Sequence, residues 1–271
     1  GVDWLALSFV QRAEDVLEAS DLANGRAAIL SKIEKPAAVN NFDDILEHSD
    51  GIMVARGDLG VELPVQNVPP IQKRLVRKCR AAAKPVIVAT QMMESMIESP
   101  MPTRAEVSDV ATAIYEGADA VMLSAESAAG AYPVEAVTTM DNVATEVEQD
   151  PTYRQINAPT RDAKGTSIAD GNVSAAREIA ETTEIKAICC FSQSGTTAAL
   201  TARERPRVPI IVMTSRERTA RRLTLSWGCN CVIVDELERF KQAVVNSARA
   251  ATRQGYADKQ DKIVVTAGVP F

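Results

Sequence analysis

The chain has 271 residues, 46% of them hydrophobic and 24% charged, which is the composition of a globular protein with one large domain or two smaller ones. Its net charge of -6 argues against nucleic-acid binding, because phosphate backbones need clustered lysines and arginines. No apolar run approaches ~18 residues, so no membrane partner is expected.

Five apolar runs organise the first half, and all are continuous, as in strands that are buried on both faces. They cover residues 1–8, 27–34, 49–58, 84–91 and 117–126. Helical patterns lie between and after them, over 11–23, 37–48, 66–83, 104–116 and 133–148. Strands and helices that alternate in this way predict βα units and a parallel sheet.

The second half begins with a polar, proline-containing segment that reads as a linker. The predicted helices that follow cover 170–183, 198–204, 216–226 and 237–254, and the predicted strands 186–191, 209–213, 231–234 and 262–267. This pattern indicates a smaller α/β domain. The expected organisation is therefore a first domain over 1–150, a linker over 151–166 and a second domain over 167–271.

The cysteines and the single histidine limit the chemistry. No basic segment of a signal peptide precedes the first apolar run, so reduced thiols in a cytoplasmic protein are expected. The five cysteines read as buried apolar side chains, with a metal site as the weaker alternative, because adjacent strand residues point to opposite faces. His48 reads as a cation near a helix C-terminus.

Polar side chains stand at the carboxyl end of every predicted strand of the first half. They are Ser8, Lys32, Glu34, Arg56, Asp58, Thr90 and Glu126. In a parallel α/β sheet these ends share one face, and ligands bind there. Lys32 and Glu34 are two residues apart, so their side chains should point into the same site. The alternative is that these residues are solvated loop positions.

The residue types at these ends suit a small dianionic substrate with a divalent metal. Glu34 and Asp58 offer the hard oxygen ligands that Mg²⁺ or Mn²⁺ prefers. Lys32 supplies a cation for a phosphoryl or enolate oxygen. Gly57 allows close approach to backbone amides, and Thr90 adds a hydroxyl.

Four motifs in this order resemble the pyruvate kinase family: "SKIEK", "GIMVARGDLGVELP", "KPVIVATQMMESMI" and "PTRAEVSDVATAIYEGADAVMLSAES". The resemblance implies about five βα units of a TIM (β/α)8 barrel, followed by a smaller three-layer α/β domain. It also implies phosphoryl transfer from phosphoenolpyruvate to ADP, giving pyruvate and ATP in glycolysis.

The resemblance also implies roles for individual residues. Lys32 and Thr90 match catalytic positions, and Glu34 and Asp58 match the ligands of the Mg²⁺ ion. The implied substrate-binding residues are Ser8, Lys32, Ala55, Arg56, Gly57, Asp58, Thr90 and Glu126. The motif around Glu126 is usually S-G-E-T and reads S-A-E-S here, which keeps the acid but changes its neighbours.

Other parts of the family pattern have no counterpart in this chain. The lid domain, an upstream arginine for the phosphate and the main ligands of a K⁺ ion are absent. We therefore expect the chain alone to be a poor catalyst. The family usually forms homotetramers, and residues 104–116 resemble one contact surface.

The segment "SQSGTT" (192–197) lies between a predicted strand and a predicted helix. Its hydroxyls, glycine and amides are typical of a phosphate-binding loop, but no G-K follows as in a nucleoside-triphosphate P-loop. A simple helix cap is the alternative. The resemblance implies a site for a phosphorylated allosteric effector of unspecified identity. Its candidate residues are Ser192, Ser194, Gly195, Thr196 and Thr197.

Two other functions fit part of the pattern. A metal-dependent lyase or aldolase acting on a pyruvate enolate would share Glu34 and Asp58 but would not need Lys32. A non-catalytic sugar-phosphate sensor or assembly module would use 192–197 without a metal.

Overall fold

The structure is a computed structural model that describes residues 1–158, 167–235 and 240–267. It divides into two compact units, Gly1–Asn157 and Ala158–Phe271, which are described separately.

Unit 1 is a parallel five-stranded sheet with strand order β1-β2-β3-β4-β5. Its strands are β1 (Trp4–Leu7), β2 (Ala28–Ile33), β3 (Gly51–Ala55), β4 (Val86–Ala89) and β5 (Ala120–Met122). The α-helices are α1 (Ala13–Ala23), α2 (Pro36–Asn40), α3 (Phe42–His48), α4 (Arg56–Glu62), α5 (Val68–Ala81), α6 (Arg104–Tyr115), α7 (Ala125–Ala128), α8 (Pro133–Gln149) and α9 (Pro151–Ile156). Two short 3-10 turns, η1 (Val65–Asn67) and η2 (Glu94–Ile97), complete it. The predicted parallel α/β arrangement is confirmed.

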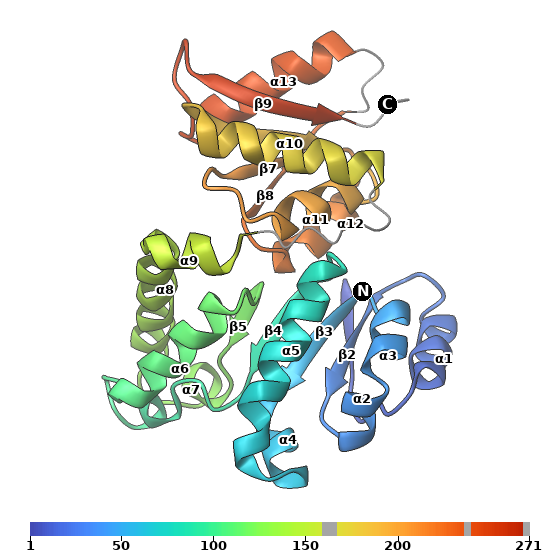
Figure 1. The fold of residues 1–271 in the computed structure, drawn as a ribbon, viewed down its shortest axis with the longest axis vertical. Helices are drawn as coiled ribbons and strands as arrows, with labels where there is room; N and C mark the ends of the chain where they lie inside the picture. The colour runs from blue at the N-terminus through green and yellow to red at the C-terminus, as the bar shows by residue number, and fades with distance from the viewer. Residues whose placement is uncertain (159–166, 236–239, 268–271) are drawn as a thin grey trace. The chain divides into compact units, whose positions relative to one another are not determined.

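The core of unit 1 lies between the sheet and its helices, and Figure 1 shows α1, α3 and α5 alongside the strands. The central strands β2, β3 and β4 are almost wholly buried, whereas the edge strands β1 and β5 are partly exposed. Because β1 and β5 leave two open edges, this sheet forms part of a barrel and does not close into one.

Several local predictions for unit 1 were wrong in detail. The helix expected over 37–48 is two helices that meet at Asn41. Residues 56–58, expected to continue a strand, begin α4. The linker expected from residue 151 begins instead with α9, because the Asp150 side chain caps the helix by accepting a hydrogen bond from Thr152 N at 2.6 Å. The rest of that linker, 159–166, lies outside the described residues.

Unit 2 holds a four-stranded parallel sheet with strand order β8-β7-β6-β9. Its strands are β6 (Ile185–Phe191), β7 (Ile210–Thr214), β8 (Cys229–Ile233) and β9 (Lys262–Ala267). Its helices are α10 (Ile168–Thr182), α11 (Thr196–Arg203), α12 (Glu217–Arg222), the 3-10 turn η3 (Leu223–Leu225) and α13 (Phe240–Arg253).

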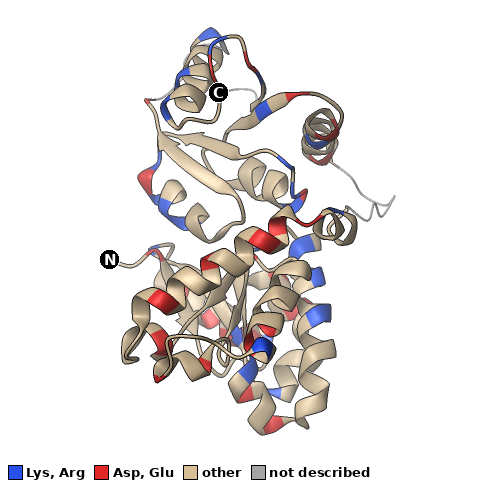
Figure 2. Ribbon diagram, turned by 90° about the vertical axis from the view of Figure 1, so that its left-hand side faces the viewer, with Lys and Arg blue, Asp and Glu red and all other residues tan. Residues whose placement is uncertain are grey.

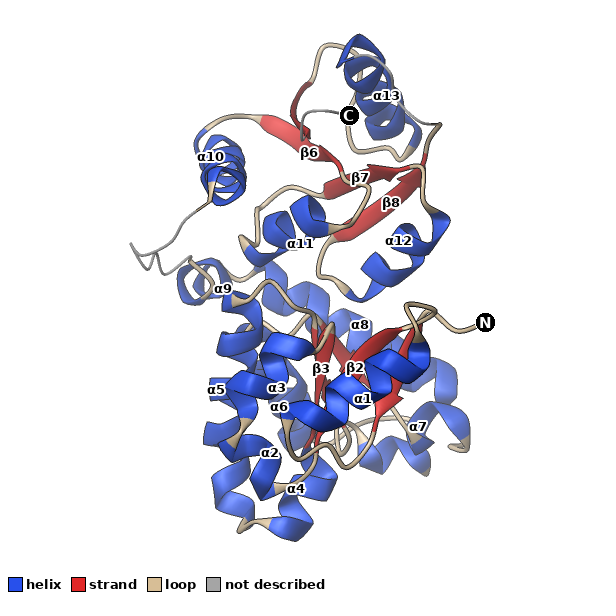
Figure 3. Ribbon diagram, turned by 90° about the vertical axis from the view of Figure 1, so that its right-hand side faces the viewer, coloured by secondary structure: helices blue, strands red, loops and turns tan. Residues whose placement is uncertain are grey.

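The two faces of this second sheet are covered by different helices. Cys189 and Ile211 pack with Ala251 of α13 on one face, while Cys190 packs with Ala198 of α11 on the other. Figure 3 shows this order, with α13 on one side of the strands and α11 and α12 on the other. The predicted three-layer domain is confirmed.

Basic and acidic residues are interspersed along the helices of both units, as the colours of Figure 2 show. His48 is exposed in the last turn of α3, as predicted. Cys79, Cys189 and Cys190 are buried, and Cys229 and Cys231 are partly buried. No helix in the described ranges is long and apolar enough to cross a membrane.

Candidate active site

The end of β2 brings together three of the predicted site residues. Lys32 Nζ lies 2.6 Å from Glu34 Oε1 and donates to Ser8 Oγ at 3.0 Å. The Glu34 side chain is 2% exposed and the Lys32 side chain 25%, so the carboxylate is removed from water while the ammonium stays partly open to it. The two side chains meet, as their spacing along an extended chain predicts.

Phe9 is a part of this cluster that the sequence analysis missed. Its backbone N–H donates to Glu34 Oε2 at 2.8 Å, so both oxygens of the carboxylate are engaged. Phe9 has φ 59°, which is unusual for a bulky residue and is the kind of strain found at functional sites. The aromatic ring is exposed, and Lys35 Nζ lies 5.5 Å from its centroid. No sequence signal marks this residue, because its role uses the backbone amide.

Gly57 and Thr90 form a second cluster, at the ends of β3 and β4. Gly57 N–H donates to Thr90 Oγ1 at 2.8 Å, and Oγ1 lies 2.6 Å from Ala89 O. A Cβ added at Gly57 would sit 3.2 Å from Thr90 Oγ1, so glycine permits this approach. Ala55 is buried at the end of β3 and precedes the first turn of α4.

The guanidinium of Arg56 has protein partners on all sides. Nη1 forms an ion pair with Asp109, with 2.7 Å to Oδ1 and 2.6 Å to Oδ2. Nη2 donates to Thr90 O at 2.7 Å and to Gln91 O at 2.9 Å. The side chain is buried, so a role for Arg56 in substrate binding would have to use its backbone.

Glu126 is also buried, with partners of its own. Its Oε2 accepts a hydrogen bond from Ser124 N at 2.7 Å, and Oε1 accepts one from Met93 N at 3.4 Å. The carboxylate therefore ties the loop after β4 to the start of α7.

Asp58 is exposed in the first turn of α4, following β3, which is the neighbour of β2 in the sheet. Glu34 and Asp58 thus come from adjacent strand ends, and carboxylate oxygens from such a pair suit a small hard cation. In the described part of the chain no group of three or more His, Cys, Asp or Glu could hold a metal ion. The donor set fits Mg²⁺ or Mn²⁺, which is held by one or two carboxylates and completed by substrate oxygens and water.

The segment 192–197 follows β6, and its last two residues, Thr196 and Thr197, begin α11. Ser192 Oγ accepts from Gly195 N at 3.0 Å, and Ser194 Oγ lies 3.0 Å from Thr196 Oγ1. Gly195 has φ 93°, a conformation that favours glycine. The strand order places β6 between β7 and β9, so the loop stands at the carboxyl end of a central strand. Ligands of open α/β sheets bind outside the carboxyl ends of the strands.

These features define an α/β enzyme with a partial barrel, whose strand ends gather a lysine, two carboxylates and an amide–hydroxyl pair. Residues 1–137 match the family model "Pyruvate kinase, barrel domain", and residues 171–271 match "Pyruvate kinase, alpha/beta domain". The chain belongs to the pyruvate kinase family.

Individual relatives agree with this assignment. The chain is 50% identical over 271 residues to a pyruvate kinase of Methylorubrum extorquens, covering 100% of this chain and 57% of that protein. It is 46% identical over 274 residues to a pyruvate kinase of Geobacillus stearothermophilus, covering 100% of this chain and 47% of that protein. A crystal structure of a pyruvate kinase from Cryptosporidium parvum superposes with a TM-score of 0.91 at 36% identity, covering 99% of this chain and 57% of that one. The chain thus spans about half the length of the relatives it matches. The comparisons support neither of the alternative functions, the lyase or aldolase and the sugar-phosphate sensor.

Proposed function

We propose that this chain forms the enolpyruvate- and metal-binding part of a pyruvate kinase, together with its effector domain. The reaction is phosphoryl transfer from phosphoenolpyruvate to ADP. The observation that carries the proposal is the ion pair between the partly exposed Lys32 and the buried Glu34 at the end of β2, because it pairs a phosphoryl-directed cation with a metal-ligating carboxylate. Alone, the chain would be weakly active or inactive.

The roles of the chain's own residues follow from charge and position. Lys32 would neutralise charge on the transferring phosphoryl group and on the enolate oxygen that is left behind. Ser8, which accepts from Lys32, keeps the ammonium at the strand end. The Gly57 amide and the Thr90 hydroxyl would hold the substrate carboxylate, with Ala55, Arg56 and Asp58 contributing from the same strand end, and Glu126 would shape the neighbouring loop.

Glu34 and Asp58 would hold the Mg²⁺ or Mn²⁺ ion. When bound, it would draw together the substrate oxygens and offset their negative charge. A K⁺ ion is expected as well, with its main ligands outside this chain.

The test is Mn²⁺ binding to this chain with and without oxalate, a mimic of enolpyruvate, in parallel with circular dichroism. We expect oxalate to tighten Mn²⁺ binding, and Glu34→Gln to abolish both the binding and the enhancement. The matched control is Glu62→Gln, which removes the carboxylate of a nearby ion pair, Lys35 Nζ to Glu62 Oε1 at 2.6 Å. Glu62→Gln should bind Mn²⁺ and oxalate like the wild type. A folded wild-type chain that binds neither ligand would refute the proposal.

The proposal extends to the second unit and to assembly. A phosphorylated effector would bind at Ser192, Ser194, Gly195, Thr196 and Thr197, as the strand order and the loop hydroxyls support. Titration with a sugar phosphate, compared with Thr196→Val, tests this site. A homotetramer in the cytoplasm completes the proposal, and analytical ultracentrifugation tests the assembly.

A further inference from the structure

The loop that follows β4 has a strained backbone next to the candidate carboxylate site. Thr90 has φ 69° and Gln91 has φ 54°, so two successive residues other than glycine are left-handed. This conformation is unfavourable for a β-branched residue and persists only where surrounding contacts impose it. The contacts that impose it should therefore decide where the Thr90 hydroxyl lies.

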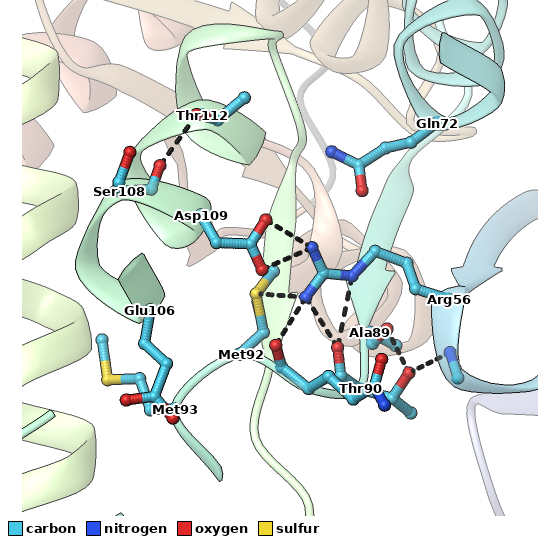
Figure 4. Close-up of polar contacts among 12 residues, drawn as sticks. Arg56, Gln72, Ala89, Thr90, Met92, Met93, Glu106, Ser108, Asp109 and Thr112 are labelled. Carbon is cyan, nitrogen blue, oxygen red and sulfur yellow. Dashed lines mark hydrogen bonds and ion pairs between the residues drawn. The ribbon is translucent and has the colours of Figure 1, made fainter. Parts of the chain in front are cut away.

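Those contacts come from Arg56, as Figure 4 shows. Its Nε and Nη2 donate to Thr90 O at 3.2 Å and 2.7 Å, and Nη2 also donates to Gln91 O at 2.9 Å. Both carbonyls of the left-handed turn are thus directed at one guanidinium. Arg56 also precedes Gly57 in the chain, so the same residue fixes the amide and, through the turn, the hydroxyl.

A buried guanidinium needs a compensating charge, and Asp109 supplies it. Its two oxygens lie 2.7 Å and 2.6 Å from Arg56 Nη1. Asp109 is carried by α6, whose first turn is fixed by a capping box between Thr103 and Glu106. Glu106 also accepts from Ser95 N at 2.7 Å, which anchors the helix to η2.

We infer that Asp109 is a positioning residue for the carboxylate site, acting through Arg56 to hold the Thr90 hydroxyl against the Gly57 amide. Asp109 itself touches neither of these groups. What Gly57 and Thr90 bind rests on the proposed function, whereas the positioning can be measured without any ligand.

The first measurement is hydrogen exchange of the backbone amides of residues 89–92 and of Gly57 in the unliganded 271-residue chain. Asp109→Asn keeps the shape of the side chain and removes its charge. We expect exchange in these segments to rise about tenfold or more, because the guanidinium loses its counter-ion and releases the turn. Asp109→Glu restores the charge and should give a clearly smaller increase.

Two matched controls separate this effect from general destabilisation. Ser108→Ala changes the neighbouring exposed residue of α6, and Asp43→Asn removes the carboxylate of an exposed ion pair with Lys78. Both should leave exchange at 89–92 unchanged. Exchange of β3 residues 51–55 serves as an internal reference for opening of the whole unit. Unchanged exchange at 89–92 in Asp109→Asn would overturn the inference, and so would equal increases at 89–92 and 51–55 in Asp109→Glu.

A second measurement links the turn to the ligand. At saturating Mn²⁺, Asp109→Asn should weaken oxalate binding about tenfold while Mn²⁺ binding without oxalate stays unchanged. Equal weakening of both ligands would contradict a positioning role. A wild-type chain that binds no oxalate would refute the proposed function, while the exchange experiment would still decide the role of Asp109.

Discussion

Replacing Gly117 by alanine should destabilise unit 1 strongly. Gly117 ends α6 in a Schellman motif, in which its N–H donates to Ile114 O at 2.9 Å and Ala118 N donates to Ala113 O at 3.2 Å. Its φ is 97°, and an added Cβ would lie 2.8 Å from Asn157 Oδ1. The buried Asn157 amide would have to move.

The magnitude follows from two costs. A left-handed alanine costs about 1–2 kcal/mol. Asn157 Oδ1 accepts from Arg80 Nη1 at 2.6 Å, and Nδ2 donates to Tyr115 O at 3.0 Å and Tyr153 O at 3.1 Å. Loss of one hydrogen bond to a charged group costs about 1.5–3 kcal/mol more. We therefore expect Gly117→Ala to lower the free energy of unfolding of unit 1 by about 2.5–5 kcal/mol.

The assay must report each unit separately. Urea unfolding with pulsed alkylation, read by mass spectrometry, does so, because Cys79 is buried in unit 1 and Cys189 in unit 2. Burial raises the pKa of both thiols, so neither should react in the folded chain. Gly117→Ala should shift the Cys79 transition to lower urea and leave the Cys189 transition in place.

Gly25→Ala is the matched control for the backbone cost. Gly25 has φ 67°, but a Cβ there would meet no atom within 4 Å, so only about 1–2 kcal/mol should be lost. In a chain that already carries Asn157→Ala, Gly117→Ala should lower the free energy of unfolding by as little as Gly25→Ala does, because the obstructing amide is gone. A Gly117→Ala loss no greater than that of Gly25→Ala would refute the steric argument.

Two further predictions concern charge. Hydrogen bonds from Ser167 and Arg203 lower the pKa of Asp170 to about 2. This carboxylate should therefore stabilise the folded chain at pH values above its ordinary pKa of 3.8, and the stabilisation should be lost as the pH falls toward 2. In unfolding measured as a function of pH, Asp170→Asn should remove this part of the acid dependence. Lys32→Gln should raise Mn²⁺ affinity in the absence of oxalate, because Glu34 loses its internal cation, and it should weaken oxalate binding. Calorimetric titration measures both affinities. A loss of Mn²⁺ affinity like that of Glu34→Gln would contradict the idea that Lys32 competes with Mn²⁺ for Glu34.

The sequence predicted the sheet well because each strand is a continuous apolar run that ends at polar residues. It predicted the meeting of Lys32 and Glu34 for the same reason, since two residues on one strand share a side. The helix α4 was missed because its sequence, "RGDLGVE", holds two glycines, which have low helix propensity. Tertiary contacts of Arg56 fix its first turn instead.

Contacts between distant residues account for the rest of what the sequence did not reveal. Arg56 stands in a motif full of candidate ligands, and nothing local shows that its guanidinium belongs to Asp109, 53 residues away. Glu126 likewise accepts a hydrogen bond from Met93 N, which is 33 residues away in the sequence. The helix at 151–156 is different, because Asp150 followed by proline is a recognisable helix start, although the sequence analysis interpreted this segment only as a linker.

Two groups of the candidate site have partners within the protein. Glu34 is engaged by Lys32 and by the Phe9 amide, and the Gly57 amide is engaged by Thr90 Oγ1. If the proposed roles hold, Lys32 must exchange Glu34 for a substrate oxygen. The binding free energy of each ligand then reflects only the difference between the contacts that it makes and the internal contacts that it replaces. Lys32→Gln should therefore act in opposite directions on metal and oxalate affinity, which a site of independent, solvated groups would not show.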